Sequence, residues 1–229
     1  MLTFLFFFKK IALAFVVIVS VGFAYSAIAY ANSFTTAQTV ALDKELYYLV
    51  DESTHTQAVS SFAQLQGGAG YVLETDAREY VAYSMYFDKT ESESAQTSLQ
   101  EQDVKTTVHV VSVDALIFRT REQKRRAPAV ISAFSCLDGC MQVLNQEIAR
   151  LEKGATQQSS KRILTTLIDQ FTHLQTQHQT SYPEFALVCE NAKKQLQNCI
   201  SDIVYVKDLR YVLCELGVAY AGLSQEFTL

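Results

Sequence analysis

The chain has 229 residues, with 19 Lys and Arg against 24 Asp and Glu, so its formal net charge is −5. This acidic balance argues against nucleic acid as the main partner, because phosphate binding requires a basic face. The length beyond the N-terminal region suits one large domain or two small ones, and the sequence pattern favours two.

The first feature is an uncharged apolar stretch, Ile11 to Ala31, which directly follows Lys9 and Lys10. Its length matches a bilayer core, and flanking lysines hold the N-terminus of such a helix on the cytoplasmic side. Residues 1–31 are therefore predicted to be a transmembrane anchor that places the rest of the chain outside the cytoplasm. The alternative is a cleaved signal peptide, because Ala29-Tyr30-Ala31 fits the small-x-small cleavage pattern. Both alternatives export the chain.

After a polar spacer at 32–44, residues 45–115 carry alternating strand and helix signals. Aromatic and β-branched runs predict strands, while Thr54-x-x-Gln57 and Thr90-x-x-Glu93 have the capping-box form of helix starts. The predicted order is β-α-β-β-α-β, with strands at 46–50, 70–74, 79–87 and 104–113. This α+β order is the ferredoxin-like split βαβ arrangement, an antiparallel sheet with both helices on one face and the other face open.

The strand at 79–87 separates into two alternating sets. Val81, Tyr83, Met85 and Phe87 form the bulkier set, which is predicted to face the helices. The open face is predicted to hold polar and aromatic side chains that stack on sugar rings and bond hydroxyls: Tyr47, Tyr80, Ser84, Tyr86 and His109. The alternative is that these side chains cover the strands or contact other helices.

These elements resemble the SPOR family of cell-envelope modules. The resemblance rests on Tyr48-Leu49-Val50, the helix Thr54 to Gln66, Gly70-Tyr71, and Tyr80-Val81 to Phe87 followed by the helix Thr90 to Leu99. It covers about 70 residues. The chain departs from the family at Asp51-Glu52-Ser53 and Met85-Tyr86-Phe87, where SPOR modules typically place Gly-x-Phe. The resemblance implies a non-catalytic module that binds peptidoglycan glycan strands at sites of division or sporulation.

A basic segment follows at 116–128, and it is predicted to be the boundary between two domains. Its basic residues are Arg119, Arg121, Lys124, Arg125 and Arg126, and Pro128 is predicted to begin the next helix. One interpretation is a solvated connector. The other is a patch for anionic envelope polymers or lipid headgroups.

Residues 129–229 show helical spacing throughout, which predicts a bundle of three long helices, the last broken near Val204 to Lys207. The first helix is predicted to end at Gly154, and Ser181-Tyr182-Pro183-Glu184 is a third capping box. The apolar residues of the first helix recur in alternating steps of four and three, which places them on one face: Val130, Phe134, Leu137, Met141, Leu144, Ile148 and Leu151.

No motif of a known enzyme class occurs, so the chain is predicted to bind and not to catalyse, without metal or cofactor. The five cysteines are predicted to be buried thiols between helices, with one disulfide involving Cys189 as the alternative. The alternative function is a structural interaction protein of an envelope, division or sporulation assembly that docks a protein partner through its bundle.

Overall fold

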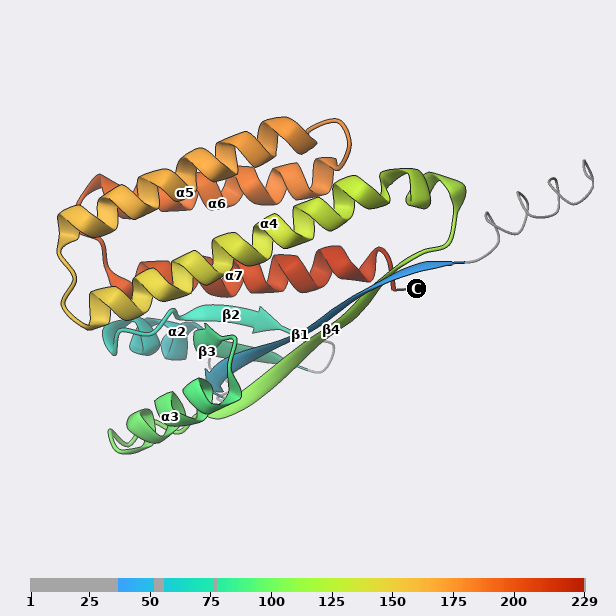
Figure 1. The fold of residues 1–229 in the computed structure, drawn as a ribbon. Coiled ribbons are helices and arrows are strands. Elements are labelled where there is room, and N and C mark those ends of the chain that lie inside the picture. Colours follow the sequence, from blue (N-terminus) through green and yellow to red (C-terminus); the bar gives the residue numbers. More distant parts are fainter. Residues whose placement is uncertain (1–36, 52–55, 76–77, 229) are drawn as a thin grey trace, which may run out of the picture. The chain divides into compact units, whose positions relative to one another are not determined.

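The computed structural model describes residues 37–51, 56–75 and 78–228, so the predicted anchor and Thr54 lie outside the described residues. The fold is mixed α+β, with a four-stranded antiparallel sheet and several helices (Figure 1). In chain order the elements are β1 (Gln38–Asp51), α2 (Thr56–Leu65), β2 (Tyr71–Glu74), β3 (Glu79–Tyr86), α3 (Lys89–Gln100), β4 (Thr107–Phe118), α4 (Arg121–Glu152), α5 (Gln157–His178), α6 (Pro183–Ser201) and α7 (Val206–Gln225).

The described residues divide into two units. Residues 39–117 and 126–228 form one compact unit, which contains the sheet and the buried parts of helices α4 to α7. Gln38 and Phe118–Arg125 belong to the other unit. The segment 116–128, predicted as a linker, is instead the end of β4 and the start of α4.

The early start of α4 has a local cause, which is a capping box. The Gln123 amide donates to Thr120 Oγ1 at 3.1 Å, and the Thr120 amide donates to Gln123 Oε1 at 3.0 Å. These reciprocal bonds satisfy two amides of the first turn. The predicted start at Pro128 is therefore wrong, because Pro128 lies inside the helix.

The sheet order is β2-β3-β1-β4. Tyr48 pairs with Met85 and Leu49 with Ser84, whereas the next pair along is Val50 with Ala82. Tyr83 is therefore the extra residue of a β-bulge in β3. A bulge places two successive residues of one strand opposite one residue of its partner. The alternation of the β3 side chains between the two faces of the sheet therefore shifts by one residue at Tyr83.

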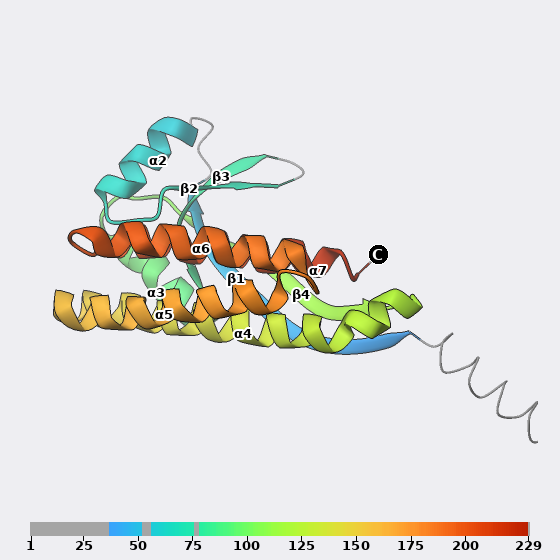
Figure 2. The ribbon, with the colours of Figure 1, turned by 90° about the horizontal axis from the view of Figure 1, so that it is seen from above.

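Both faces of the sheet are covered near the bulge. On one face lies α7, where a Cβ added at Gly217 would come within 2.4 Å of the Tyr48 hydroxyl and 2.2 Å of Met85 Sδ. On the opposite face, Val81 and Tyr83 form a buried cluster with Ala63 of α2. Figure 1 shows α7 between the sheet and helices α5 and α6, and Figure 2 shows the same bundle from above. The prediction of one open face is thus wrong around Tyr48 and Met85, because these large side chains are fully buried under α7.

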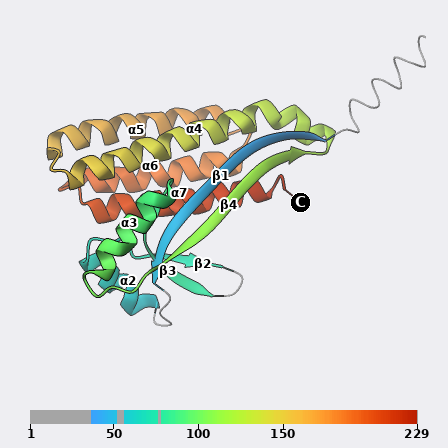
Figure 3. The same ribbon diagram turned by 60° about the horizontal axis from the view of Figure 1, so that its bottom comes forward.

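β1 and its edge neighbour β4 are longer than predicted. β1 begins at Gln38, so much of the predicted spacer 32–44 is strand, and β4 continues to Phe118. Figure 3 shows these two strands side by side. Burial in β1 alternates up to Glu45 and is continuous from Leu46 to Val50, which explains why only the second half carries a strong strand signal.

The remaining helices bury the faces that the sequence predicts, but two of them have an N-cap residue other than the predicted one. The α4 seam from Val130 to Ile148 is buried, and Gly154 follows the helix with φ +87°. Asp88 caps α3, accepting from the Glu91 amide at 3.0 Å, so the predicted cap at Thr90 is wrong. The predicted cap at Ser181 is also wrong, because Tyr182 is the N-cap residue of α6 and makes no side-chain cap bond.

The predicted break in the last helix is confirmed, since α6 ends at Ser201 and α7 begins at Val206. Among the described residues, α4 is the one helix long and apolar enough to cross a membrane by length and composition. Its most apolar stretch is 44% buried inside the protein.

Candidate functional site

The five residues predicted to share one sheet face are divided between its two faces. Because of the bulge at Tyr83, Ser84 and Tyr86 lie on the face opposite to that of Ala82 and Tyr80. Tyr80 stacks on His109, with ring centroids 5.3 Å apart, and Arg78 Nε donates to its hydroxyl at 2.8 Å. Tyr47 pairs with Tyr86 across the two strands, so it lies on the same face as Tyr86. Its hydroxyl donates a hydrogen bond to Glu45, and this bond raises the pKa of the Tyr47 phenol.

Ser84 and Tyr86 line a cleft of about 710 Å³, which is within the size range of ligand sites. One wall is formed by α3 and the turn after it, which contribute Ser94, Ser98 and Gln102. The opposite wall is the C-terminal part of α4 and the turn after it, with Asn145, Gln146, Ala149, Glu152 and Lys153. The strands β1 and β3 supply the floor, and Arg210 of α7 closes one side. All of these residues lie in the larger compact unit.

This cleft is named here the α3–α4 cleft, and uncharged hydrogen-bonding side chains are the largest group in its lining, beside apolar ones such as Leu49, Leu99 and Ile148. Amides come from Gln66, Gln102, Asn145 and Gln146, and hydroxyls from Ser84, Ser94 and Ser98. The charged groups balance, since Glu91 and Glu152 are matched by Lys153 and Arg210. Amides and hydroxyls both donate and accept hydrogen bonds, so this lining suits an uncharged, hydroxyl-rich ligand better than a strongly charged one.

The two tyrosines of the cleft are held in the neutral form. Burial raises the pKa of Tyr86, an effect that Arg210 and a hydrogen bond from Ser84 partly oppose. Burial also raises the pKa of Tyr83 to about 12, helped by the nearby Asp51 carboxylate. Tyr86 is half-buried and Tyr83 is only 2% exposed, so Tyr86 is the aromatic side chain accessible to a ligand.

Arg210 fixes the side of the cleft by joining three elements. Its Nη1 donates to the carbonyl oxygen of Gly67 at 2.7 Å, and its Nη2 pairs with Glu152 at the end of α4. Gly67 has φ +81°, a left-handed conformation that ends α2 and turns its carbonyl toward this contact. The guanidinium therefore holds α7, the end of α4 and the loop after α2 together.

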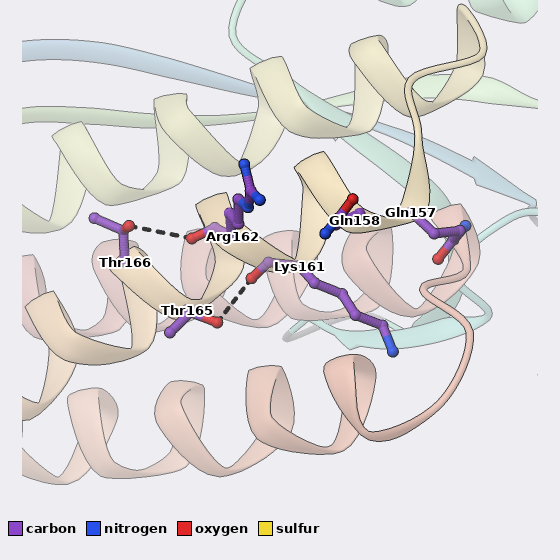
Figure 4. Close-up of a pocket in the computed structure, with 6 residues that line it drawn as sticks. All are labelled: Gln157, Gln158, Lys161, Arg162, Thr165 and Thr166. Carbon is purple, nitrogen blue, oxygen red and sulfur yellow. Dashed lines mark hydrogen bonds between the residues drawn. The ribbon is translucent and has the colours of Figure 1, made fainter.

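A second hollow, on α5, has a different character (Figure 4). Its lining comes from a single helix and consists of Gln157, Gln158, Lys161, Arg162, Thr165 and Thr166. Thr165 and Thr166 donate to the carbonyls of Lys161 and Arg162, at 2.8 and 3.1 Å. In the α3–α4 cleft, Ser98 and Gln102 likewise donate to the carbonyls of Ser94 and Ser98, so the two hollows differ in their walls and not in this bonding. This hollow is a helix surface without a second wall.

The basic segment separates into two parts. Arg126 is directed at the bundle, where its Nε donates to the Ser181 carbonyl at 3.1 Å and its guanidinium lies 5.5 Å from the Tyr182 ring centroid. Arg119, Arg121, Lys124 and Arg125 belong to the smaller unit and are exposed or half-buried. Arg125 pairs with Glu122 at 2.9 Å, a surface ion pair of small energetic weight.

Within the described ranges, no group of three or more His, Cys, Asp or Glu side chains is arranged to hold a metal ion. All five cysteines lie in the described part of the chain and are free thiols, with Cys136 exposed and the other four buried. The alternative of a disulfide at Cys189 is therefore wrong for this structure.

Sequence reasoning identified Ser84 and Tyr86 but not the other polar residues of the cleft. Gln102, Asn145, Gln146, Lys153 and Arg210 come from three helices, or the turns directly after them, that are distant in sequence, and no local spacing connects them. No family model, curated protein or solved structure matches the chain.

Proposed function

We propose that the chain is a single-pass, membrane-anchored protein of the bacterial cell envelope that binds peptidoglycan glycan strands and has no catalytic activity. The N-terminus lies in the cytoplasm and the folded part outside it, held to the membrane by residues 11–31. The support for export is the uncharged apolar stretch after Lys9-Lys10. The SPOR-like assignment is supported by the element order β1-α2-β2-β3-α3-β4 and the strand order β2-β3-β1-β4, which fit a split βαβ sheet.

The observation that carries the glycan proposal is the α3–α4 cleft. A glycan strand offers hydroxyls, amides and apolar ring faces, and the cleft offers amides, hydroxyls and the half-buried Tyr86 ring. The proposed site thus moves from an open sheet face to the face that carries Ser84 and Tyr86. Tyr80 and His109 lie on the opposite face and are not part of it.

The direct test is co-sedimentation of the full-length, detergent-solubilised chain with purified peptidoglycan. We expect the chain to pellet with the wall material and to release no reducing ends from it. A chain that stays in the supernatant contradicts the glycan proposal. Release of reducing ends contradicts the non-catalytic part of it.

A second candidate function, docking of a protein partner in an envelope assembly, is favoured by exposed apolar side chains. In the bundle, Leu187 of α6 is 58% exposed, and Ile203 and Tyr205 in the connection to α7 are about half exposed. On α2, Leu65 is 85% exposed. Side chains of this kind in protein interfaces are excluded from water when a partner binds. Replacing Leu187 and Ile203 with serine should leave sedimentation with peptidoglycan unchanged, which separates the two functions.

A further inference from the structure

The two edges of the sheet differ in how they are protected. β2, at one edge, has only four residues, ends in Glu74 and packs against α2 and α7. β4, at the other edge, has twelve residues, and within the described part of the chain no strand lies beyond it in the sheet order. Figure 3 shows the length of β4 beside β1. An edge strand presents main-chain amides and carbonyls that have no strand partner, and natural proteins usually shield such groups.

The sequence of β4 lacks the residues that usually shield an edge. Residues 107–113 include no Asp, Glu, Lys, Arg, proline or glycine, and four of these seven residues are valine. Val110 is 44% exposed. Charged residues and proline keep an edge strand from pairing with another chain, whereas β-branched residues favour the extended conformation. This part of β4 is therefore suited to pairing with a further strand.

Two hydrogen bonds define the limits of the uncovered edge. The Ile117 amide donates to the carbonyl oxygen of Phe227, in the turn after α7, at 2.9 Å, so this amide is directed away from β1. At the other end, Gln96 of α3 donates to the carbonyl oxygen of Thr106 at 2.6 Å. Main-chain groups of a strand point to alternate sides, so every second amide before Ile117 also points outward: Ala115, Val113, Val111 and His109. Residues 108–115 are named here the β4 edge.

A second copy of this chain fits the β4 edge. Two identical edges that pair antiparallel about a two-fold axis bring the outward amides of each copy to the outward carbonyls of the other. Around Val110, near the middle of the edge, uncharged residues then face uncharged residues. The first charged residues outside 107–113 are Lys105 and Asp114. Antiparallel pairing brings the Lys105 end of one copy to the Asp114 end of the other, so these flanking charges are complementary.

We propose that the β4 edge pairs antiparallel with the β4 edge of a second copy, which joins the two sheets into one continuous sheet. The dimer is a property beyond glycan binding. The α3–α4 cleft lies on β1 and β3, whereas the pairing uses the outer side of β4, so either proposal can fail without the other.

The test is sedimentation equilibrium of the full-length chain in density-matched detergent. We expect the parent to be a dimer that dissociates on dilution. Val110→Lys and Val110→Glu should each be monomeric, because like charges that meet across an antiparallel pair are destabilising. An equimolar mixture of these two variants should be dimeric again, since opposite charges then meet. Val143→Lys, at an exposed valine of α4, is the matched control and should sediment as the parent does.

A monomeric parent overturns the inference and would leave the β4 edge to a strand of another protein. A dimer that persists in both Val110 variants assigns the association to another surface, such as the N-terminal apolar stretch, and also overturns it. Failure of the mixture to restore the dimer overturns the pairing of identical edges.

Amide hydrogen exchange of the parent gives a measurement that needs no variant. Peptides covering residues 108–115 should exchange more slowly as the protein concentration rises, because pairing protects the outward amides. Exchange that is independent of concentration overturns the inference. Both experiments are carried out without peptidoglycan, so their failure is distinguishable from failure of the glycan proposal.

Discussion

The guanidinium of Arg210 donates a hydrogen bond of 2.7 Å to the main-chain carbonyl of Gly67, 143 positions earlier in the chain. The same side chain pairs with Glu152. A residue of the last helix thus holds the loop after α2 and the end of α4, which together border the α3–α4 cleft. Lysine cannot reproduce this forked geometry, because it carries a single ammonium group.

Arg210→Lys should therefore lower the free energy of unfolding by about 1 kcal/mol, the net worth of a hydrogen bond of this kind. Urea denaturation of the variant and the parent measures the difference. Arg162→Lys, at an exposed position of α5, is the matched control and should be neutral. Equal stability of the Arg210 variant and the parent would show that Arg210 does not brace the cleft.

Gly217→Ala tests the contact between α7 and the sheet. A Cβ at this position would come within 2.2 Å of Met85 Sδ and 2.4 Å of the Tyr48 hydroxyl, and both side chains are fully buried. Overpacking of this kind costs about 1–3 kcal/mol. Gly222→Ala, in the same helix and with no neighbouring atom within 4 Å, should instead stabilise the protein by roughly 0.5–1 kcal/mol through helix propensity. Thermal denaturation of the two variants should shift in opposite directions, and a common direction would contradict this packing.

His178 should make the protein sensitive to mild acid. It is 2% exposed, neither ring nitrogen has a hydrogen-bond partner, and burial lowers its pKa. A folded-state pKa below the unfolded value of about 6.5 means that the unfolded state binds the proton more readily. The free energy of unfolding is therefore highest above about pH 6.5 and decreases as the pH falls from there toward the folded-state pKa.

His178→Phe preserves an aromatic contact with Phe185, whose ring centroid lies 5.0 Å from that of His178, and removes the titrating group. The free energy of unfolding, measured by guanidinium denaturation at pH 7 and at pH 5, should fall less between the two pH values in this variant than in the parent. The loss of one titrating group accounts for at most about 1.4 kcal/mol per pH unit of that fall. An unchanged difference between the two pH values would show that His178 does not cause the acid sensitivity.

The cysteines should react in two classes. Cys136 is exposed, whereas burial raises the pKa of Cys140 and Cys199 to about 11 and that of Cys189 to about 12. A thiol with a raised pKa holds little thiolate, which is the reactive form. A disulfide-exchange reagent should label one thiol quickly in the native protein and all five after denaturation without reductant. Fewer than five thiols in denaturant would indicate a disulfide in the isolated protein.

Local patterns predicted much of the fold. The buried seam of α4 from Val130 to Ile148 and the helix stop at Gly154 follow from apolar spacing and from a glycine with positive φ. The start of α4 was also encoded locally, by the Thr120 and Gln123 capping box, although the surrounding cations suggested a linker.

The candidate site was less predictable, for two physical reasons. A bulge adds one residue without disturbing the apolar character of a strand, so alternation alone placed Tyr80 and Tyr86 on the same face. The walls of the cleft also meet only when α3, α4 and α7 pack around the sheet, which no local spacing of Gln102, Lys153 or Arg210 indicates.

The central proposal is that the α3–α4 cleft binds glycan strands. Its most direct test is the affinity for soluble peptidoglycan glycan strands, measured by titration calorimetry on the full-length chain in detergent and compared between the parent and variants at Tyr86 and Tyr80. Tyr86→Ala should weaken binding by at least about tenfold, which corresponds to about 1.4 kcal/mol. Gln102→Ala, at an exposed position of the same cleft, should weaken it in the same direction without loss of folding. Tyr80→Ala, on the opposite face of β3, should bind as the parent does. Binding that survives both cleft substitutions, or that is lost with Tyr80→Ala, would contradict the proposed site.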